Sequence, residues 1–143
     1  VLSILHHIGG LHNIWDGLAY SYKRDIPRTA IISISNSYDS IPLFAQNPNI
    51  KKKLYLFFDD VDFGEPCCIS KADAQRIAEY IRSMDESIEQ LIVHCEAGIS
   101  RSAGVCAAIM KATTGKDNEI FDNPKFHPNM ACYRTVLAAL YSA

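Results

Sequence analysis

The sequence predicts a single α/β domain with a central, mainly parallel sheet that is flanked by helices. Two short runs, residues 29–35 and 54–58, are rich in β-branched, aromatic or other apolar side chains and predict buried strands. Segments with the apolar spacing of helices alternate with such strands, an order that favours a parallel sheet covered on both faces. The 143 residues suffice for one core, so we expect residues 1–143 to form one domain.

The first part of the chain predicts a strand, a helix and a turn. Residues 1–5 are apolar enough for a first strand. Residues 11–22 place their apolar side chains at the spacing of one helix face. Three consecutive lysines, Lys51 to Lys53, precede the strand at 54–58, and we expect them to form a solvated turn.

The middle of the chain predicts a helix over residues 71–84. Ser70 and Asp73 have the spacing of a capping box, in which each side chain accepts a hydrogen bond from the backbone of the other. Apolar residues then repeat at helical spacing at Ala74, Ile77, Ala78 and Ile81. The helix should therefore begin directly after Ser70.

A further strand and two helices complete the predicted order. Residues 91–93 form a short apolar run, and small or apolar side chains occur on every side of residues 101–112. This pattern predicts a buried strand, a turn and a buried helix that ends near Gly115. After two turns that contain proline, residues 130–141 again have the spacing of a helix.

Composition and charge exclude several classes of partner. The net charge is −2, and the 14 Lys and Arg are scattered, which gives no basic surface for nucleic acid. No apolar run approaches the roughly 18 residues of a membrane span, so we expect no membrane partner. Five cysteines at irregular spacing fit neither a disulfide framework nor a paired zinc motif. Reduced thiols in the cytoplasm are the expectation.

Residues 94–102, with the sequence HCEAGISRS, form a candidate phosphate site between a strand and a helix. Backbone N–H groups that converge in such a turn, together with the positive end of the helix dipole, bind an anion. Gly98 allows the loop to curl, and Arg101 supplies a guanidinium that can bind two phosphate oxygens at once. The same surroundings stabilise the thiolate of Cys95, which makes this cysteine a candidate nucleophile.

His-Cys-x5-Arg-Ser after a strand resembles the signature of the protein tyrosine and dual-specificity phosphatase superfamily. The order of strands and helices from residue 29 to residue 112 also resembles a small dual-specificity phosphatase core. The resemblance implies that Cys95 is the nucleophile and that Arg101 binds the phosphoryl group. It also implies that Ser102 hydrogen-bonds the sulfur as it departs, and that His94 orients the loop. The phosphate-binding loop would consist of Glu96, Ala97, Gly98, Ile99, Ser100 and Arg101.

The family takes its general acid from an aspartate in a loop that precedes the cysteine, and this chain offers Asp59, Asp60 and Asp62. The dual-specificity pattern places the acid at the second residue after the strand at 54–58, which selects Asp60. Alternatively, residues 62–66 resemble the Asp-x-Gly-x-Pro of larger tyrosine phosphatases, which selects Asp62. Asp60 is the expected acid and Asp62 the alternative.

The predicted reaction is the hydrolysis of phosphotyrosine, and of phosphoserine or phosphothreonine, on a protein or peptide through a phosphocysteine intermediate. Glu96 and Ile99 supply no positive charge where phosphoinositide phosphatases that resemble this family carry lysines, which argues against inositol lipids. One alternative is a sulfurtransferase or arsenate reductase of the rhodanese type. A second is a catalytically silent module that binds phosphorylated partners.

No cofactor or metal is expected. His6, His7 and His12 lack a cysteine or carboxylate partner at a spacing that would complete a metal site. Cys67 and Cys68 lie close in sequence to the aspartates, and one of them is a candidate partner for an oxidised Cys95. The alternative for this pair is two half-buried residues with only a packing role.

Overall fold

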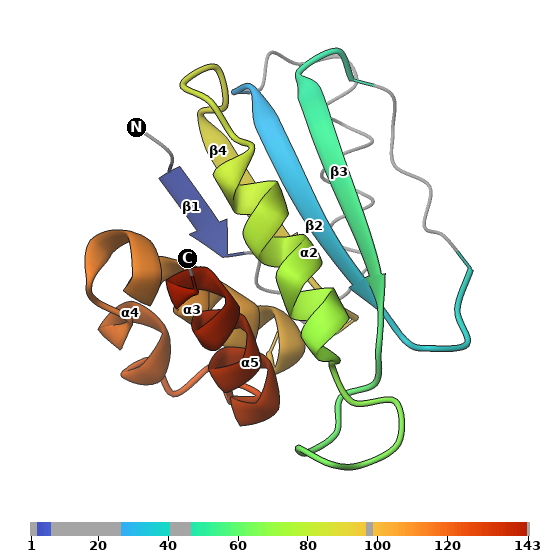
Figure 1. The fold of residues 1–143 in the computed structure, drawn as a ribbon. Coiled ribbons are helices and arrows are strands. Elements are labelled where there is room, and N and C mark those ends of the chain that lie inside the picture. Colours follow the sequence, from blue (N-terminus) through green and yellow to red (C-terminus); the bar gives the residue numbers. More distant parts are fainter. Residues whose placement is uncertain (1–2, 7–26, 41–46, 97–98, 143) are drawn as a thin grey trace.

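The computed structural model describes residues 3–6, 27–40, 47–96 and 99–142, and its centre is a parallel four-stranded sheet (Figure 1). The strands are β1 (Ser3–His6), β2 (Thr29–Ser35), β3 (Ile50–Phe57) and β4 (Gln90–His94). They lie side by side in the order β1-β4-β2-β3. Because all pairs are parallel, the carboxyl ends of β2, β3 and β4 meet at one edge of the sheet.

The lysines before the strand at 54–58 are placed differently from the prediction. β3 begins at Ile50, so Lys51 to Lys53 are part of the strand and not a solvated turn. β3 lies at the end of the strand order, where lysine ammonium groups can reach water while their stems stay in the strand. Lys52 Nζ donates a hydrogen bond to Ser83 Oγ at 2.6 Å and lies 5.4 Å from the ring centroid of Tyr80.

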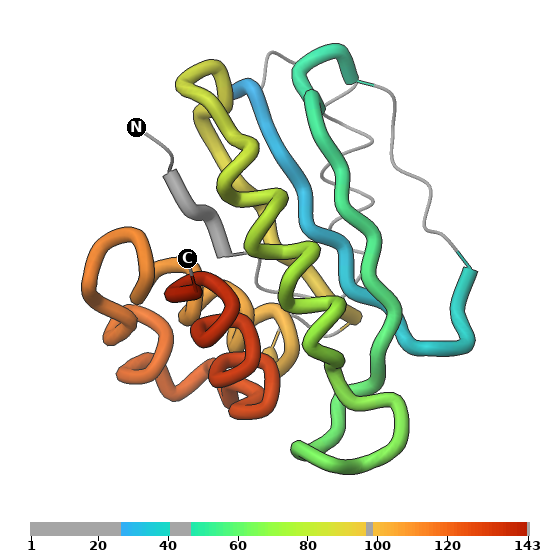
Figure 2. Tube along the Cα trace, in the orientation of Figure 1, coloured from blue at the N-terminus to red at the C-terminus, as the bar shows by residue number. Residues whose placement is uncertain are grey.

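The helices are α2 (Lys71–Arg82), α3 (Arg101–Thr114), the short α4 (Asn118–Phe121) and α5 (Met130–Tyr141). α2 crosses the sheet in Figure 1, and α5 packs between α2 and α3, as the trace in Figure 2 also shows. The guanidinium of Arg82 ties α2 to the end of α5 by donating to Ala139 O at 2.9 Å and Ser142 O at 2.7 Å. The predicted helix over residues 11–22 lies outside the described residues.

Local signals decide where two of these helices begin and end. Ser70 Oγ accepts from Asp73 N, and Asp73 Oδ2 accepts from Ser70 N, each at 3.0 Å, so the predicted capping box is confirmed. The helix ends at Arg82, two residues earlier than predicted. α3 ends against Gly115, which has a φ of 82° and donates its N–H to Lys111 O. The sequence did not predict α4.

The core lies between β2, β4 and the helix layer. All residues of β2 are buried, and so is every residue of α3 from Arg101 to Ile109. Gly104 allows α3 to approach the start of α5, because a Cβ at this position would lie only 2.4 Å from the backbone oxygen of Asn129. This packing fixes the first turn of α3 at the carboxyl edge of the sheet. In the part of the chain that the structure describes, no helix is long and apolar enough to cross a membrane.

Candidate active site

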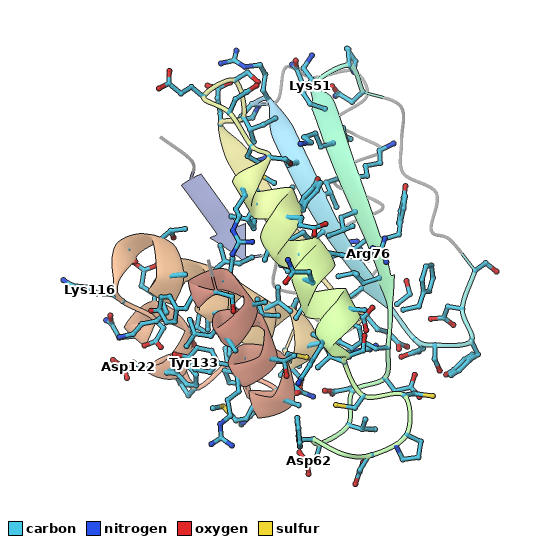
Figure 3. All side chains as sticks on the ribbon, in the orientation of Figure 1. Lys51, Asp62, Arg76, Lys116, Asp122 and Tyr133 are labelled. Atoms are coloured by element: carbon cyan, nitrogen blue, oxygen red, sulfur yellow. The ribbon has the colours of Figure 1, made fainter. Side chains whose placement is uncertain are left out.

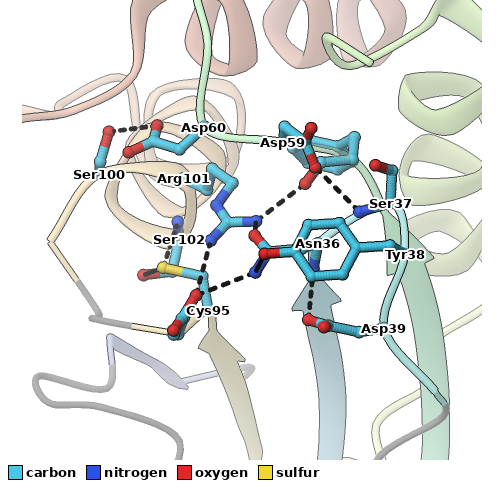
Figure 4. A network of polar contacts seen from close by, with 12 residues as sticks. Asn36, Ser37, Tyr38, Asp39, Asp59, Asp60, Cys95, Ser100, Arg101 and Ser102 are labelled. Carbon is cyan, nitrogen blue, oxygen red and sulfur yellow. Dashed lines mark hydrogen bonds and ion pairs between the residues drawn. The ribbon is translucent and has the colours of Figure 1, made fainter.

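The residues after three strands meet at the carboxyl edge of the sheet (Figure 4). Cys95 follows β4, residues 36–39 follow β2, and Asp59 and Asp60 come shortly after β3. The first turn of α3 reaches the same place, because α3 begins at Arg101, soon after β4 ends at His94. This edge is where open parallel sheets bind their ligands.

Cys95 is held by the first turn of α3. Its side chain is buried, with 2% exposed, and its Sγ is hydrogen-bonded to Ser102 Oγ at 3.2 Å. The backbone N–H of Ser102 also donates to Sγ, at an N-to-S distance of 3.4 Å. A hydroxyl group, one backbone N–H donor and the N-terminus of α3 therefore face one sulfur atom.

The two other buried cysteines have surroundings of a different kind. Burial raises the pKa of Cys106 to about 12, with a smaller contribution from the charge of Glu119. Burial also raises the pKa of Cys132. Both thiols therefore stay protonated near neutral pH. All five cysteines of the chain are free thiols.

The Arg101 guanidinium lies at the same edge, and the side chain is 5% exposed. Its Nη1 donates to Asn36 Oδ1 at 2.9 Å and to the backbone oxygen of Phe58 at 2.8 Å. Its Nη2 lies 3.9 Å from Glu96 Oε2. No sequence motif marks Asn36, although its place directly after a buried strand is a usable signal.

Asp60 is joined to the Cys95 loop by Ser100 and to the start of α5 by Asn129. Asp60 Oδ1 accepts from Ser100 Oγ at 2.7 Å and from Asn129 Nδ2 at 2.8 Å. The side-chain oxygen of Asn129 caps α5 by accepting from Cys132 N at 3.0 Å. Asn129 was also missed, because nothing in the sequence between α4 and α5 indicates that this cap lies beside the aspartate.

The other two aspartates of the cluster have different positions. Asp62 is exposed and lies at the outer edge of the molecule (Figure 3), where it lines a polar pocket of about 410 Å³ together with Asp60 and Ser100. Asp59 Oδ1 accepts from the backbone N–H of Ser37 at 2.9 Å. Hydrogen bonds from Ser37, and to a smaller extent the charge of Arg101, lower the pKa of Asp59.

The remaining residues of the predicted loop are only partly described. His94 is fully buried at the end of β4, in register with Ser33 of β2. Ala97 and Gly98 lie outside the described residues. The backbone oxygen of Ile99 accepts from His127 N at 3.0 Å, and that of Ser100 accepts from Asn129 N at 2.9 Å. The loop is thus anchored to the segment that leads into α5.

Two minor predictions concern metals and cysteine oxidation. Among the described residues, no three His, Cys, Asp or Glu side chains are grouped so that they could hold a metal ion. His7 and His12 are not described. Cys67 is exposed and Cys68 half-buried, both in the loop that carries the aspartates. Their pairing with an oxidised Cys95 stays a prediction.

Comparison with known proteins finds similarity at the level of the fold. No family model and no curated protein matches the chain. Among solved structures, human DUSP28 matches with a TM-score of 0.59 at 15% identity, covering 96% of this chain and 90% of that one. PTPMT1 matches with a TM-score of 0.56 at 17% identity, covering 96% and 89%.

A human tyrosine phosphatase-like serine/threonine/tyrosine-interacting protein matches with a TM-score of 0.55 at 22% identity, covering 77% of this chain and 74% of that one. All three have the dual-specificity phosphatase fold. The chain therefore has this α/β fold, and the fold that the His-Cys-x5-Arg-Ser resemblance implied is confirmed.

Proposed function

We propose that this protein is a cysteine-dependent phosphatase that hydrolyses phosphotyrosine, and phosphoserine or phosphothreonine as well, on proteins or peptides. The observation that carries the proposal is the meeting of three groups at one edge of the sheet. The Cys95 sulfur is held by Ser102, the Arg101 guanidinium lies nearby, and Asp60 is bonded to the Cys95 loop. Nucleophile, oxyanion-binding group and acid are the three parts that such a displacement requires.

In the first step the Cys95 thiolate attacks phosphorus. An S–P bond forms while the P–O bond to the leaving group breaks, and the leaving oxygen takes a proton from Asp60. Arg101 and the loop amides stabilise the charge on the equatorial phosphate oxygens. The contact between Asp60 and Ser100 supports Asp60 over Asp62 as this acid, because it keeps the carboxyl group beside the loop.

In the second step water attacks the phosphorus of the phosphocysteine. Asp60, now ionised, takes a proton from that water, the S–P bond breaks, and inorganic phosphate is released. Ser102 stabilises the departing sulfur, for which its hydroxyl group is suitably placed at 3.2 Å. The reaction needs no cofactor.

The rest of the loop binds the phosphoryl group. We assign this role to Glu96, Ala97, Gly98, Ile99 and Ser100, through their backbone N–H groups, together with Arg101. His94 orients the loop from its buried position at the end of β4, beside β2. A reducing compartment such as the cytoplasm suits an enzyme that depends on a free thiol.

The test is turnover of p-nitrophenyl phosphate and of a phosphotyrosine peptide by the wild-type protein, Cys95→Ser and Cys67→Ser. We expect Cys95→Ser to abolish turnover while tungstate, a phosphate analogue, still binds. The exposed Cys67 is the matched control, and its substitution should leave turnover unchanged. Persistent turnover by Cys95→Ser would remove this cysteine from the mechanism.

The same experiment, together with a thiosulfate:cyanide assay, separates the two alternatives. A rhodanese-type sulfurtransferase would transfer sulfur from thiosulfate to cyanide and would not hydrolyse the phosphate ester. The dual-specificity phosphatase fold of the matched structures supports the phosphatase against this alternative. A silent module would bind tungstate without turnover, and one of the matched proteins is described as phosphatase-like.

A further inference from the structure

The hydrogen bonds of Arg101 leave one particular edge of its guanidinium for a ligand. A guanidinium group has five N–H donors in a rigid plane, two of them on each Nη atom and one on Nε. The two N–H donors of Nη1 point to Asn36 Oδ1 at 2.9 Å and to Phe58 O at 2.8 Å. An oxyanion that binds two donors at once must then take the edge formed by Nε and Nη2.

Asn36 also reaches the Cys95 loop. Its Nδ2 donates to Glu96 Oε2 at 3.0 Å, and the same carboxylate oxygen lies 3.9 Å from Arg101 Nη2. The side chains of Asn36, Arg101 and Glu96 therefore form a closed ring of polar contacts. Figure 4 labels two of its members, Asn36 and Arg101. The amide of Asn36 thus contacts Arg101 through Nη1 and also holds the Glu96 carboxylate, which lies beside Nη2 of the same guanidinium.

The position of Asn36 is fixed by its own surroundings. It directly follows Ser35, the last residue of β2, which lies within the sheet between β4 and β3. Its backbone N–H donates to Asp39 Oδ2 at 2.9 Å. The next N–H, that of Ser37, donates to Asp59 Oδ1. The amide group of Asn36 is thus carried on a rigid strand end, as a positioning group must be.

We propose that Asn36 is a positioning residue that holds Arg101 with its Nε–Nη2 edge turned to the phosphoryl group, and that Glu96 completes this arrangement. For turnover the inference rests on the proposed phosphatase function. For anion binding it stands independently, because a silent phosphate-binding module would need the same orientation of Arg101. Asn36 does not contact the reacting atoms and takes no part in proton transfer.

The experiment measures tungstate binding by calorimetry in a Cys95→Ser background, where no turnover occurs. Asn36→Ala removes the side-chain contacts with Arg101 and Glu96. We expect the dissociation constant of tungstate to rise roughly ten- to hundredfold, the range for losing hydrogen bonds to charged groups. Asn36→Asp keeps an acceptor for Arg101 but places a second carboxylate against Glu96, so tungstate binding should also weaken.

The conservative rescue is the double variant Asn36→Asp with Glu96→Gln. It keeps the net charge of the pair and reverses the hydrogen bond, since the new amide at position 96 can donate to the new carboxylate at position 36. We expect the double variant to regain most of the affinity lost by Asn36→Asp alone. A merely structural role of Asn36 would not predict this recovery.

Two results would overturn the inference: wild-type tungstate affinity in Asn36→Ala, or no recovery in the double variant when both single variants melt near the wild-type temperature. If Asn36→Ala fails to fold, the comparison of Asn36→Asp with the double variant decides alone. A third outcome is that the wild-type protein shows no turnover but its tungstate binding depends on Asn36. This result would contradict the proposed function and leave the inference intact.

In the active enzyme, steady-state kinetics give a second readout. Asn36→Ala should lower kcat/KM by a similar factor for good and poor leaving groups, because phosphoryl binding and not proton donation is affected. It should also leave the alkaline limb of the pH profile in place. A loss confined to poor leaving groups would assign Asn36 to the acid instead and contradict the inference.

Discussion

The hydroxyl of Ser100 donates a 2.7 Å hydrogen bond to Asp60 Oδ1, which joins the Cys95 loop directly to the loop that follows β3. Asn129 donates to the same carboxylate oxygen at 2.8 Å and brings the N-terminus of α5 into the contact. Three segments that are far apart in the sequence therefore hold one carboxyl group against the loop that carries the candidate nucleophile.

Asp60→Asn should slow turnover by about 100- to 10,000-fold for poor leaving groups, because the general acid is lost. Activated substrates, whose leaving oxygen needs no proton, should lose much less. The pH profile of kcat/KM should lose its alkaline limb. Asp62→Asn is the matched control, since Asp62 is exposed and lies in the same loop. If the Asp62 variant shows these effects and the Asp60 variant does not, Asp62 is the acid.

Ser102→Ala should slow the hydrolysis of the phosphocysteine more than its formation. The hydroxyl lies 3.2 Å from Cys95 Sγ, and a hydrogen bond to a charged sulfur contributes about 1.5–3 kcal/mol. Rapid mixing with p-nitrophenyl phosphate should then show a burst of p-nitrophenol equal to the enzyme concentration, followed by slow turnover. Equal slowing of both phases would show that Ser102 acts on the first step as well.

Gly104→Ala should destabilise the fold by about 1–3 kcal/mol and lower activity as well. The added Cβ would lie 2.4 Å from Asn129 O, so α3 and the start of α5 must separate, and Asn129 would withdraw from Asp60. Gly115→Ala is the control, because its φ of 82° costs about 1 kcal/mol without any crowding. Denaturant unfolding and turnover together test this. Unchanged activity in a destabilised Gly104 variant would show that the packing does not support the site.

Asp59→Asn should make the stability of the folded state vary less with pH in the acid range. Hydrogen bonds from Ser37 lower the pKa of Asp59, so its ionised form stabilises the folded state above its ordinary pKa of about 4. This stability is lost as the pH falls through the lowered value. The melting temperatures of wild type and variant should therefore differ at neutral pH and converge in acid. Parallel curves would contradict the prediction, and the exposed Asp122→Asn serves as the control.

The sequence determined much of the fold because its signals are local. The capping box at Ser70 and Asp73 and the glycine at 115 act through contacts within a few residues, so they fix helix ends in any context. The lysines at 51–53 were misplaced for the opposite reason. Whether such a run lies in a turn or in a strand depends on the neighbouring β2 and on the helix that carries Tyr80, and neither is visible in the local pattern.

For the site, the resemblance carried by His-Cys-x5-Arg-Ser implied that Ser102 hydrogen-bonds the sulfur of Cys95, and the two side chains are in contact at 3.2 Å. The roles of Asn36, Asn129 and Ser100 depend on partners about 40 to 70 positions away, such as Asp60 and Arg101. A hydrogen bond requires its two atoms to lie within about 3 Å, and the separation of two residues along the chain does not show whether they come that close. It is the parallel order of β4, β2 and β3 that brings the residues after these strands to one edge of the sheet.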